Sequence, residues 1–216
     1  MEFIYVVRRQ DLFDLSFPQG FLPIEATDTD VSVATLLGRI KEKGFFVERR
    51  WAEQDSSLKQ TIPYCMVTCG DQVLALQRLM GGAEARLHGK RTIGVGGHVN
   101  PRDAEPSADL GAMGPLADVI GRTLACAAWR ELNEEVSLPP AKSVEVVGVV
   151  NDDGNSVGSV HFGLVLGVEV ERPEARVLEP DQLEGGFRPA GEIAAMARDP
   201  NKPMETWSKL VASALA

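Results

Sequence analysis

A short run of glutamates at the end of an amphipathic segment is the feature that most constrains how this chain can fold. Apolar residues recur every four positions before that run, which predicts a helix with one face in the core. They are Ile120, Leu124, Ala128 and Leu132. We expect the helix to run from about Leu116 to about Val136 and to end before Pro139-Pro140, because proline lacks the N–H that a helix interior uses.

The glutamates Glu131, Glu134 and Glu135 are spaced three and four residues apart, which places them side by side on a helix. Their charges repel one another unless a cation lies among them. Glutamate is also a strong helix former, and charge runs are usually solvated surfaces. From the residues alone, a divalent metal site and an ordinary charged surface both stay open.

A glycine-rich segment lies upstream of the helix. Residues 91–99 contain the β-branched Thr92, Ile93, Val95 and Val99 and predict a strand that opens into the pair Gly96 and Gly97. Glycines at such a place usually mark a bulge or a close approach of another group to the backbone. A glycine pair followed by Arg130-Glu131-Leu132-Asn133-Glu134-Glu135 resembles the signature of the Nudix hydrolase superfamily (MutT-like enzymes), in which a loop and a helix hold metal ions against a diphosphate.

The resemblance implies the roles of individual residues. Arg130, Glu131 and Glu134 would be catalytic, Glu131, Glu134 and Glu135 would bind the metal, and Gly96 and Gly97 would form the binding loop. Mg²⁺ is the expected ion, because it is a hard cation that bridges carboxylates to phosphates, and Mn²⁺ could replace it. The ion would polarise phosphoryl oxygens and acidify a water that attacks one phosphorus.

The expected activity is therefore that of a Nudix-type diphosphatase acting on a nucleoside-diphosphate-linked or related small molecule. By likeness, Glu131 would orient or deprotonate the attacking water, and Arg130 would orient Glu131 through a charged hydrogen bond. The identity of the substrate does not follow from the sequence, because specificity depends on loops that surround the fold.

Three departures from the Nudix pattern bear on these expectations. The closing glycine is Ser137, and the glutamate expected eight residues before the arginine is Arg122, so one acidic group is missing or comes from elsewhere. The interval from Gly97 to Arg130 is about twice as long as the pattern allows. Its extra part, residues 101–115, is rich in Ala, Gly, Asp and Pro and is expected to be a loop, either a lid or binding element or a disordered segment.

Two other functions stay open. Isomerases of isoprenoid diphosphates resemble the same superfamily but need a cysteine near the active site, and Cys126 is expected on the buried side of the helix. A catalytically silent nucleotide-binding or regulatory module is the second alternative, because of Arg122, Ser137 and the insertion.

Strands are expected on both sides of the helix, which favours an α/β fold of the Nudix type, an α/β/α sandwich around a mixed β-sheet. Two of them should form a hairpin and two more should follow the helix. The four strands are predicted at residues 62–68, 73–78, 144–150 and 157–170, and two further helices at 190–198 and 204–214.

We assign residues 60–216 to the Nudix domain and residues 1–59 to an N-terminal α/β extension used for packing or dimerisation. Within the extension, residues 2–8 predict a strand, 31–43 an amphipathic helix and 53–59 a charged, linker-like run. The apolar N-terminal strand could pair across a homodimer.

Five further side chains are weaker candidates for a contact with metal or phosphate. They are Lys90, Arg91, His98, His161 and Glu184. Packing or a solvated strand is the more common role for each of these residue types. The neighbouring Asp152 and Asp153 are expected only to shape their turn.

Composition limits the partners. The net charge of -9 opposes nonspecific binding to nucleic acid, since few cations are free to displace counterions from phosphates. No apolar stretch approaches membrane-spanning length, and the start Met1-Glu2-Phe3 lacks the basic region of a signal peptide. Cys65, Cys69 and Cys126 show no metal-ligand spacing and are expected to be reduced. We expect a cytoplasmic protein.

Overall fold

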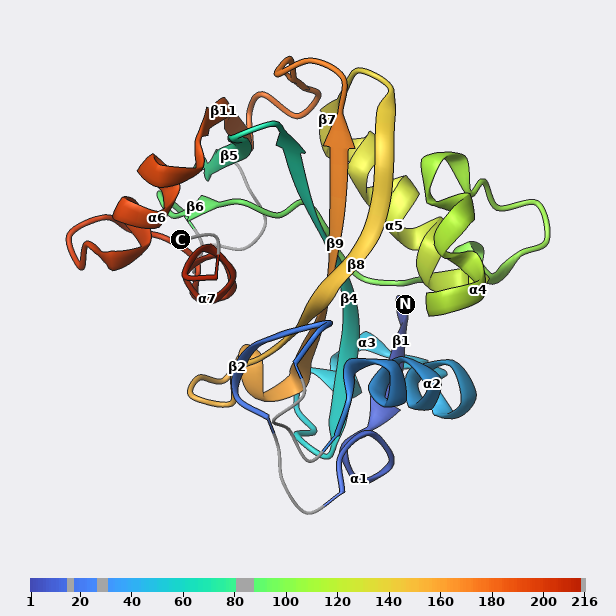
Figure 1. Cartoon of the computed structure of the whole chain (residues 1–216). Coiled ribbons are helices and arrows are strands. Elements are labelled where there is room, and N and C mark those ends of the chain that lie inside the picture. Colours follow the sequence, from blue (N-terminus) through green and yellow to red (C-terminus); the bar gives the residue numbers. More distant parts are fainter. Residues whose placement is uncertain (15–17, 27–30, 81–87, 215–216) are drawn as a thin grey trace.

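The computed structural model describes residues 1–14, 18–26, 31–80 and 88–214, and its centre is a mixed β-sheet (Figure 1). Within these residues, nine strands belong to that sheet: β1 (Phe3–Arg8), β2 (Gly20–Pro23), β3 (Phe45–Glu48), β4 (Leu58–Cys69), β5 (Gln72–Arg78), β6 (Arg91–Thr92), β8 (Ala141–Asn151), β9 (His161–Val170) and β11 (Leu183–Pro189). The main path runs β11-β5-β4-β9-β8-β2, with β1, β3 and β6 branching from it. A separate pair joins β7 (Val136–Ser137) to β10 (Arg176–Val177).

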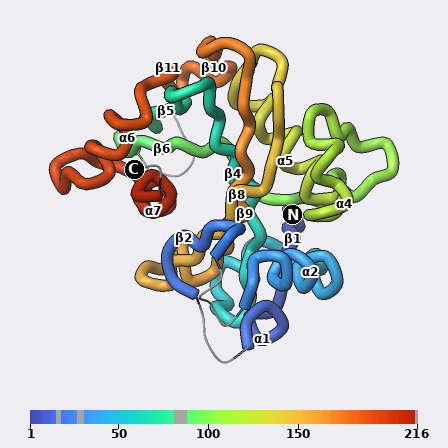
Figure 2. Tube along the Cα trace, viewed as in Figure 1, coloured from blue at the N-terminus to red at the C-terminus, as the bar shows by residue number. Residues whose placement is uncertain are grey.

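Helices cover both faces of the sheet, as the sequence predicted for an α/β/α sandwich. The long strand β4 shows this directly, because its residues alternate between two cores. Cys65 packs in the core shared with α5 (Arg122–Glu135) and α2 (Val33–Lys43). Its neighbour Tyr64 packs in a second core with α6 (Ala190–Arg198) and α7 (Thr206–Ala212). Figure 2 shows α6 and α7 on the opposite side of the strands from α4 and α5.

The predicted helix from Leu116 to Val136 is interrupted, which corrects the sequence-based boundary. A short α4 (Ala117–Ile120) ends at Gly121, whose φ of 89° lies outside the helical region and suits glycine. The following α5 starts at Arg122 and stops at Glu135, because Val136 enters the β7–β10 pair. The predicted apolar face is confirmed, since Leu124, Ala128 and Leu132 are buried.

The insertion at residues 101–115 is more ordered than the expected loop. It contains two 3₁₀ turns, η2 (Pro101–Ala104) and η3 (Gly111–Leu116), and Met113 within η3 is fully buried. The η3 turn packs against α5. Local pattern missed this, because the contact that orders the segment comes from a helix later in the chain.

The first strands of the chain belong to the same sheet as the rest. β1 pairs with β3 on one edge and with β4 and the Val99 carbonyl on the other, and β2 pairs with β8. The expectation that the N-terminal strand could pair across a homodimer loses its basis, since both edges of β1 are occupied. Leu58 and Lys59 open β4, so the predicted linker-like run 53–59 is wrong at its end. The boundary between residues 59 and 60 stays a prediction.

Most other predicted elements are confirmed with shifted ends. β4 and β5 form the predicted hairpin, and α6 has the predicted bounds. The strand predicted at 91–99 shrinks to β6 and a single bridge at Val95. The strand predicted at 157–170 begins only at His161, after the turn η4 (Gly158–Val160). Among the described residues, no helix is both long and apolar enough to cross a membrane.

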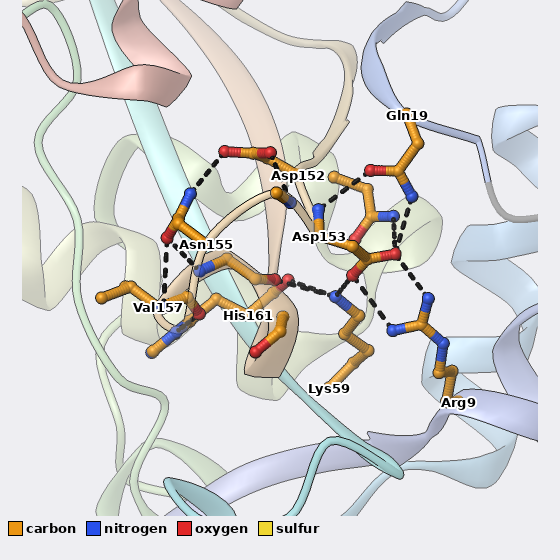
Figure 3. A network of polar contacts seen from close by, with 12 residues as sticks. Arg9, Gln19, Lys59, Asp152, Asp153, Asn155, Val157 and His161 are labelled. Carbon is orange, nitrogen blue, oxygen red and sulfur yellow. Dashed lines mark hydrogen bonds and ion pairs between the residues drawn. The ribbon is translucent and has the colours of Figure 1, made fainter.

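The turn after β8 does more than the sequence suggested (Figure 3). Asp152 shapes it as predicted, by accepting hydrogen bonds from Gly154 N (2.9 Å) and Asn155 Nδ2 (2.6 Å). Asp153 does not merely shape the turn, because its carboxylate contacts Lys59 Nζ at 2.7 Å. Lys59 is fully buried, so this turn fixes the start of β4.

Candidate active site

The glycine pair passes tightly between β4 and α5. A Cβ atom on Gly96 would overlap the carbonyl oxygen of Pro63 in β4, and one on Gly97 would lie 2.5 Å from Glu131 Oε2. The close approach predicted for these glycines is confirmed. Only a backbone without side chains lets the loop lie this close to Glu131.

Arg130 is the polar centre of the site. Its Nε and Nη2 contact the two carboxylate oxygens of Asp103 at 2.8 and 2.9 Å, and Nη2 also donates to His98 O at 2.9 Å. Its Nη1 donates to Glu131 Oε1 at 2.6 Å and to Glu134 Oε2 at 3.1 Å. Burial would lower the pKa of Arg130, but the bonds to Asp103 and Glu131 outweigh it and raise the pKa. Arg130 is therefore a permanent cation shared among three carboxylates.

Glu135 is buried with its charge poorly compensated. Its Oε2 has no hydrogen-bond partner in the described structure, and the nearest Arg78 nitrogen lies 3.6 Å from Oε1. Burial raises the pKa of Glu135 to about 7, since repulsion from Glu131, Glu179 and Glu205 offsets the attraction of Arg78. The carboxyl group is thus poised near neutrality.

Glu131 and Glu134 differ in their surroundings although they share Arg130. Burial raises the pKa of Glu131, and Arg130 offsets only part of this effect. Glu134 is exposed and turns outward, where Arg102 Nη2 lies 3.2 Å from its Oε1. The structure therefore keeps Glu131 and Glu135 on the inner side of α5 and directs Glu134 toward solvent.

The three glutamates are not gathered into a closed ligand set. Across the described ranges, no group of three or more His, Cys, Asp or Glu side chains is close enough to hold a metal ion. The physical reason is that like charges repel, while Arg78, Arg102 and Arg130 attract the carboxylates in different directions.

The inner residues nevertheless fit a divalent cation. Glu135 offers a buried oxygen without a partner, and the missing Cβ of Gly97 leaves the Glu131 carboxylate unobstructed. Carboxylate oxygens are the donors that Mg²⁺ and Mn²⁺ prefer. A bound cation would offset the burial, and the smaller repulsion between carboxylates, that raise the pKa of both groups.

Sequence reasoning missed several residues that shape this site. Asp103 had a usable signal, because Asn100-Pro101-Arg102-Asp103 has the composition of a helical N-terminus, and Asp103 does accept the Asn100 N–H at 2.8 Å. Arg78 and Glu205 had none, since the 3.1 Å contact between them joins β5 to a segment 127 residues away.

The two histidine candidates have structural partners. His98 Nε2 contacts Gln60 Oε1 at 2.8 Å, and His161 Nδ1 contacts Val157 O at 2.6 Å. Their rings lie 5.7 Å apart. These contacts hold the glycine loop to β4 and β9. Both histidine side chains therefore have a packing role.

The remaining weak candidates lie mainly on the other face of the sheet. Leu183 belongs to the core beneath α5, so the alternation of strand β11 directs Glu184 away from that core. Arg91 Nη1 donates to Met196 Sδ at 3.4 Å on the α6 side. The charge of Lys90 favours the ionised form of Glu205.

The cysteines are poorly placed for catalysis. Cys65 lies beneath Glu131 and Glu135, but burial raises its pKa to about 12 and the residue is inaccessible. Cys126 faces the insertion, where its Sγ contacts Ala108 O at 3.5 Å. A cysteine-dependent isomerase therefore gains no support from this geometry.

Comparison with known proteins places this fold in a family. No family model matches the chain. Protein YmaB of Bacillus subtilis (strain 168) is 32% identical over 220 residues, which span 99% of this chain and 97% of YmaB. The crystal structure of Tm1382, assigned to the Nudix hydrolases, matches with a TM-score of 0.75 at 29% identity, covering 99% of this chain and 98% of Tm1382. The chain has a Nudix superfamily fold.

The Tm1382 match extends over nearly the whole length of both chains. A Nudix hydrolase from Alicyclobacillus acidocaldarius matches more distantly, with a TM-score of 0.49 at 15% identity over 73% of this chain and 90% of its own.

Proposed function

We propose that this Nudix chain is a metal-dependent hydrolase that cleaves a diphosphate linkage in a nucleoside-diphosphate-linked or related small molecule. The main support is Glu135, whose buried Oε2 lacks a partner and whose pKa is raised to about 7. Burying a carboxylate without full compensation costs stability. A cation at this point offsets the cost, and the likeness to Nudix hydrolases favours hydrolysis.

Glu131, Glu134 and Glu135 would hold Mg²⁺, or Mn²⁺ in its place, beside the backbone of Gly96 and Gly97. A bound divalent cation supplies Lewis acidity, which neutralises phosphate charge and lowers the pKa of water. The net charge of -9 makes such screening necessary for any anionic substrate.

Three side chains of the protein have separate roles in the proposed reaction. Arg130 fixes Glu131 through the 2.6 Å bond to Oε1, which leaves Oε2 facing the glycine loop. Because burial raises the pKa of Glu131, its Oε2 is suited to accept a proton from an attacking water. Arg78 balances part of the charge of Glu135 and Glu205 from the β5 side.

The test is release of phosphate or pyrophosphate from a substrate panel in the presence of Mg²⁺ or Mn²⁺. The panel contains nucleotide sugars, dinucleoside polyphosphates, nucleoside triphosphates and NADH. We expect turnover of one class, and we expect Glu131→Gln and Glu134→Gln to reduce it about 100-fold or more. Glu184→Gln is the matched control, since it removes a carboxylate on the opposite face of the sheet.

Two results would count against the proposal. Turnover that persists in Glu131→Gln and Glu134→Gln at saturating Mg²⁺ would remove these residues from the site. No turnover of any class, with metal binding intact, would favour the alternative of a catalytically silent nucleotide-binding or regulatory module.

A further inference from the structure

Asp103 in the insertion is almost fully buried and directs its whole carboxylate at Arg130. Its side chain is 3% exposed, and its two oxygens receive Arg130 Nε and Nη2 at 2.8 and 2.9 Å. The Oδ2 atom also accepts the Asn100 N–H at 2.8 Å. Because both oxygens are occupied and water is excluded, Asp103 cannot itself contact a metal or a substrate.

This two-point contact decides how Arg130 shares its charge. A bidentate arginine–carboxylate pair is the strongest and most directional form of the interaction. It uses Nε and Nη2 of Arg130, so that only Nη1 remains for Glu131 and Glu134. Without Asp103, the guanidinium could turn its paired nitrogens onto either glutamate and neutralise it.

The insertion that carries Asp103 is fastened to α5 at further points. Arg122 donates to the carbonyl oxygens of Pro106 and Ala108, and Trp129 Nε1 donates to Asp109 Oδ2 at 3.1 Å. Arg122, Trp129 and Arg130 recur at positions i, i+7 and i+8, which lie on one face of a helix. The glutamate helix thus holds the insertion rigidly against itself, so this segment is a brace and not a mobile lid.

We propose that Asp103 is a positioning residue for the glutamate site. It holds Arg130 in the geometry that orients Glu131 and leaves the carboxylates of Glu131 and Glu134 available to a divalent cation. It thereby supplies, from the insertion, the acidic group that is absent at Arg122. The inference rests on the proposed function in that it assigns a cation to these glutamates.

The test compares Mn²⁺ binding by the full chain and by three variants, measured by electron paramagnetic resonance of free Mn²⁺. We expect Asp103→Asn to weaken Mn²⁺ binding about tenfold and Asp103→Glu to restore part of the loss. Asp109→Asn is the matched control, because it removes the other insertion carboxylate that contacts α5 without touching Arg130, and it should leave Mn²⁺ affinity unchanged.

A second measurement follows the contact between Arg130 and Asp103 in the absence of metal. In EDTA, the Arg130 Nε–H resonance should be protected from solvent exchange in the wild type and exposed in Asp103→Asn. Should Asp103→Asn fail to fold, Asp103→Glu keeps the charge and is expected to show a smaller loss of Mn²⁺ affinity.

The outcomes separate this inference from the proposed function. Unchanged Mn²⁺ affinity in the folded Asp103 variants, with only lower stability, would make Asp103 a structural anchor and overturn the inference. Wild-type protein that binds Mn²⁺ but hydrolyses no substrate would remove the hydrolase while the Mn²⁺ comparison still decides the role of Asp103. Wild-type protein that binds no Mn²⁺ would overturn both.

Discussion

Two buried networks in this molecule use the same kinds of charged side chain but differ in how completely the charges are paired. In the first, the ammonium of Lys59 contacts Asp153 Oδ1, Gly158 O and His161 O at 2.7, 2.8 and 3.2 Å (Figure 3). An ammonium group has three donors, so every one is used. In the second, Glu135 retains a buried oxygen that has no partner in the described structure.

The pKa values of the carboxyl groups record this difference. Partial burial would raise the pKa of Asp153, but hydrogen bonds from Arg9, Lys59 and Gln19 outweigh it and hold the pKa well below its usual range. Burial wins at Glu135 and raises its pKa to about 7. The Lys59 network is closed in the sense that its charged groups are paired, and it stabilises the fold. The charge of Glu135 is left open at a cost, as expected where a protein binds something.

The largest effect should follow from opening the closed network. Asp153→Ala leaves the ammonium of Lys59 buried without a counter-charge, and we expect a loss of about 3–5 kcal/mol in the free energy of unfolding. Urea unfolding at pH 7 measures it. Asp152→Ala, one residue away, half-buried and without a contact to Lys59 among the described hydrogen bonds, should cost about 1 kcal/mol. Equal losses in the two variants would show that the network is not the anchor we describe.

The stability that the Lys59 network contributes should be lost at acid pH. Because the folded pKa of Asp153 lies below that of an unfolded aspartate, about 3.9, its contribution is complete above that value and is lost as the pH falls below it. The stability gap between wild type and Asp153→Asn should stay constant from about pH 7 to 5 and narrow below about pH 4. Urea midpoints across this range test it, and a gap that persists undiminished at pH 3 would contradict it.

Substitutions at Gly96 and Gly97 can separate an effect on folding stability from an effect on metal binding. Gly96→Ala places a methyl group against the backbone of Pro63, which cannot move freely, so we expect a loss of about 1–3 kcal/mol. In Gly97→Ala the atoms nearest the new methyl group are the flexible end of Glu131, so stability should change little while Mn²⁺ affinity falls about tenfold. Melting temperature and Mn²⁺ binding, measured on both variants, give the answer. The reverse pattern would place Gly97 in the fold and not in the site.

What the sequence could predict depended on how far apart the interacting residues lie. The helix, its apolar face, the glutamate spacing and the need for Gly97 were all readable, because each rests on neighbours within a few residues. Asp103 with Arg130, Lys59 with Asp153 and Arg78 with Glu205 are separated by 27, 94 and 127 residues. These pairs depend on the register of the sheet and on the path of the insertion, which no local pattern encodes.

The helix boundary shows the same limit on a smaller scale. The four-residue repeat of apolar side chains continues from Ile120 to Leu124, so it predicted one helix. Gly121 interrupts it with a φ of 89°, and this lets α4 and η3 fold back against α5. A glycine within a helical pattern is tolerated in many helices, and here a tertiary contact selects the break.

The smallest effect should have the opposite sign from the others. Glu135→Gln removes a buried charge whose Oε2 lacks a partner, so in EDTA we expect the variant to be more stable than the wild type by about 1 kcal/mol. The folded pKa of about 7 exceeds the unfolded value. Wild type should therefore lose stability as the pH rises toward and through 7, and the advantage of Glu135→Gln should grow between about pH 5 and 8.

Urea midpoints in EDTA and in Mn²⁺ decide whether that cost belongs to a binding site. Adding Mn²⁺ should stabilise the wild type more than Glu135→Gln and reverse their order, because the ion binds the folded state and uses the open carboxylate. A variant that is less stable in EDTA at pH 8 would mean that Arg78 already compensates Glu135. The charge of Glu135 would then be as fully paired as that of Lys59, and the contrast between the two networks would not hold.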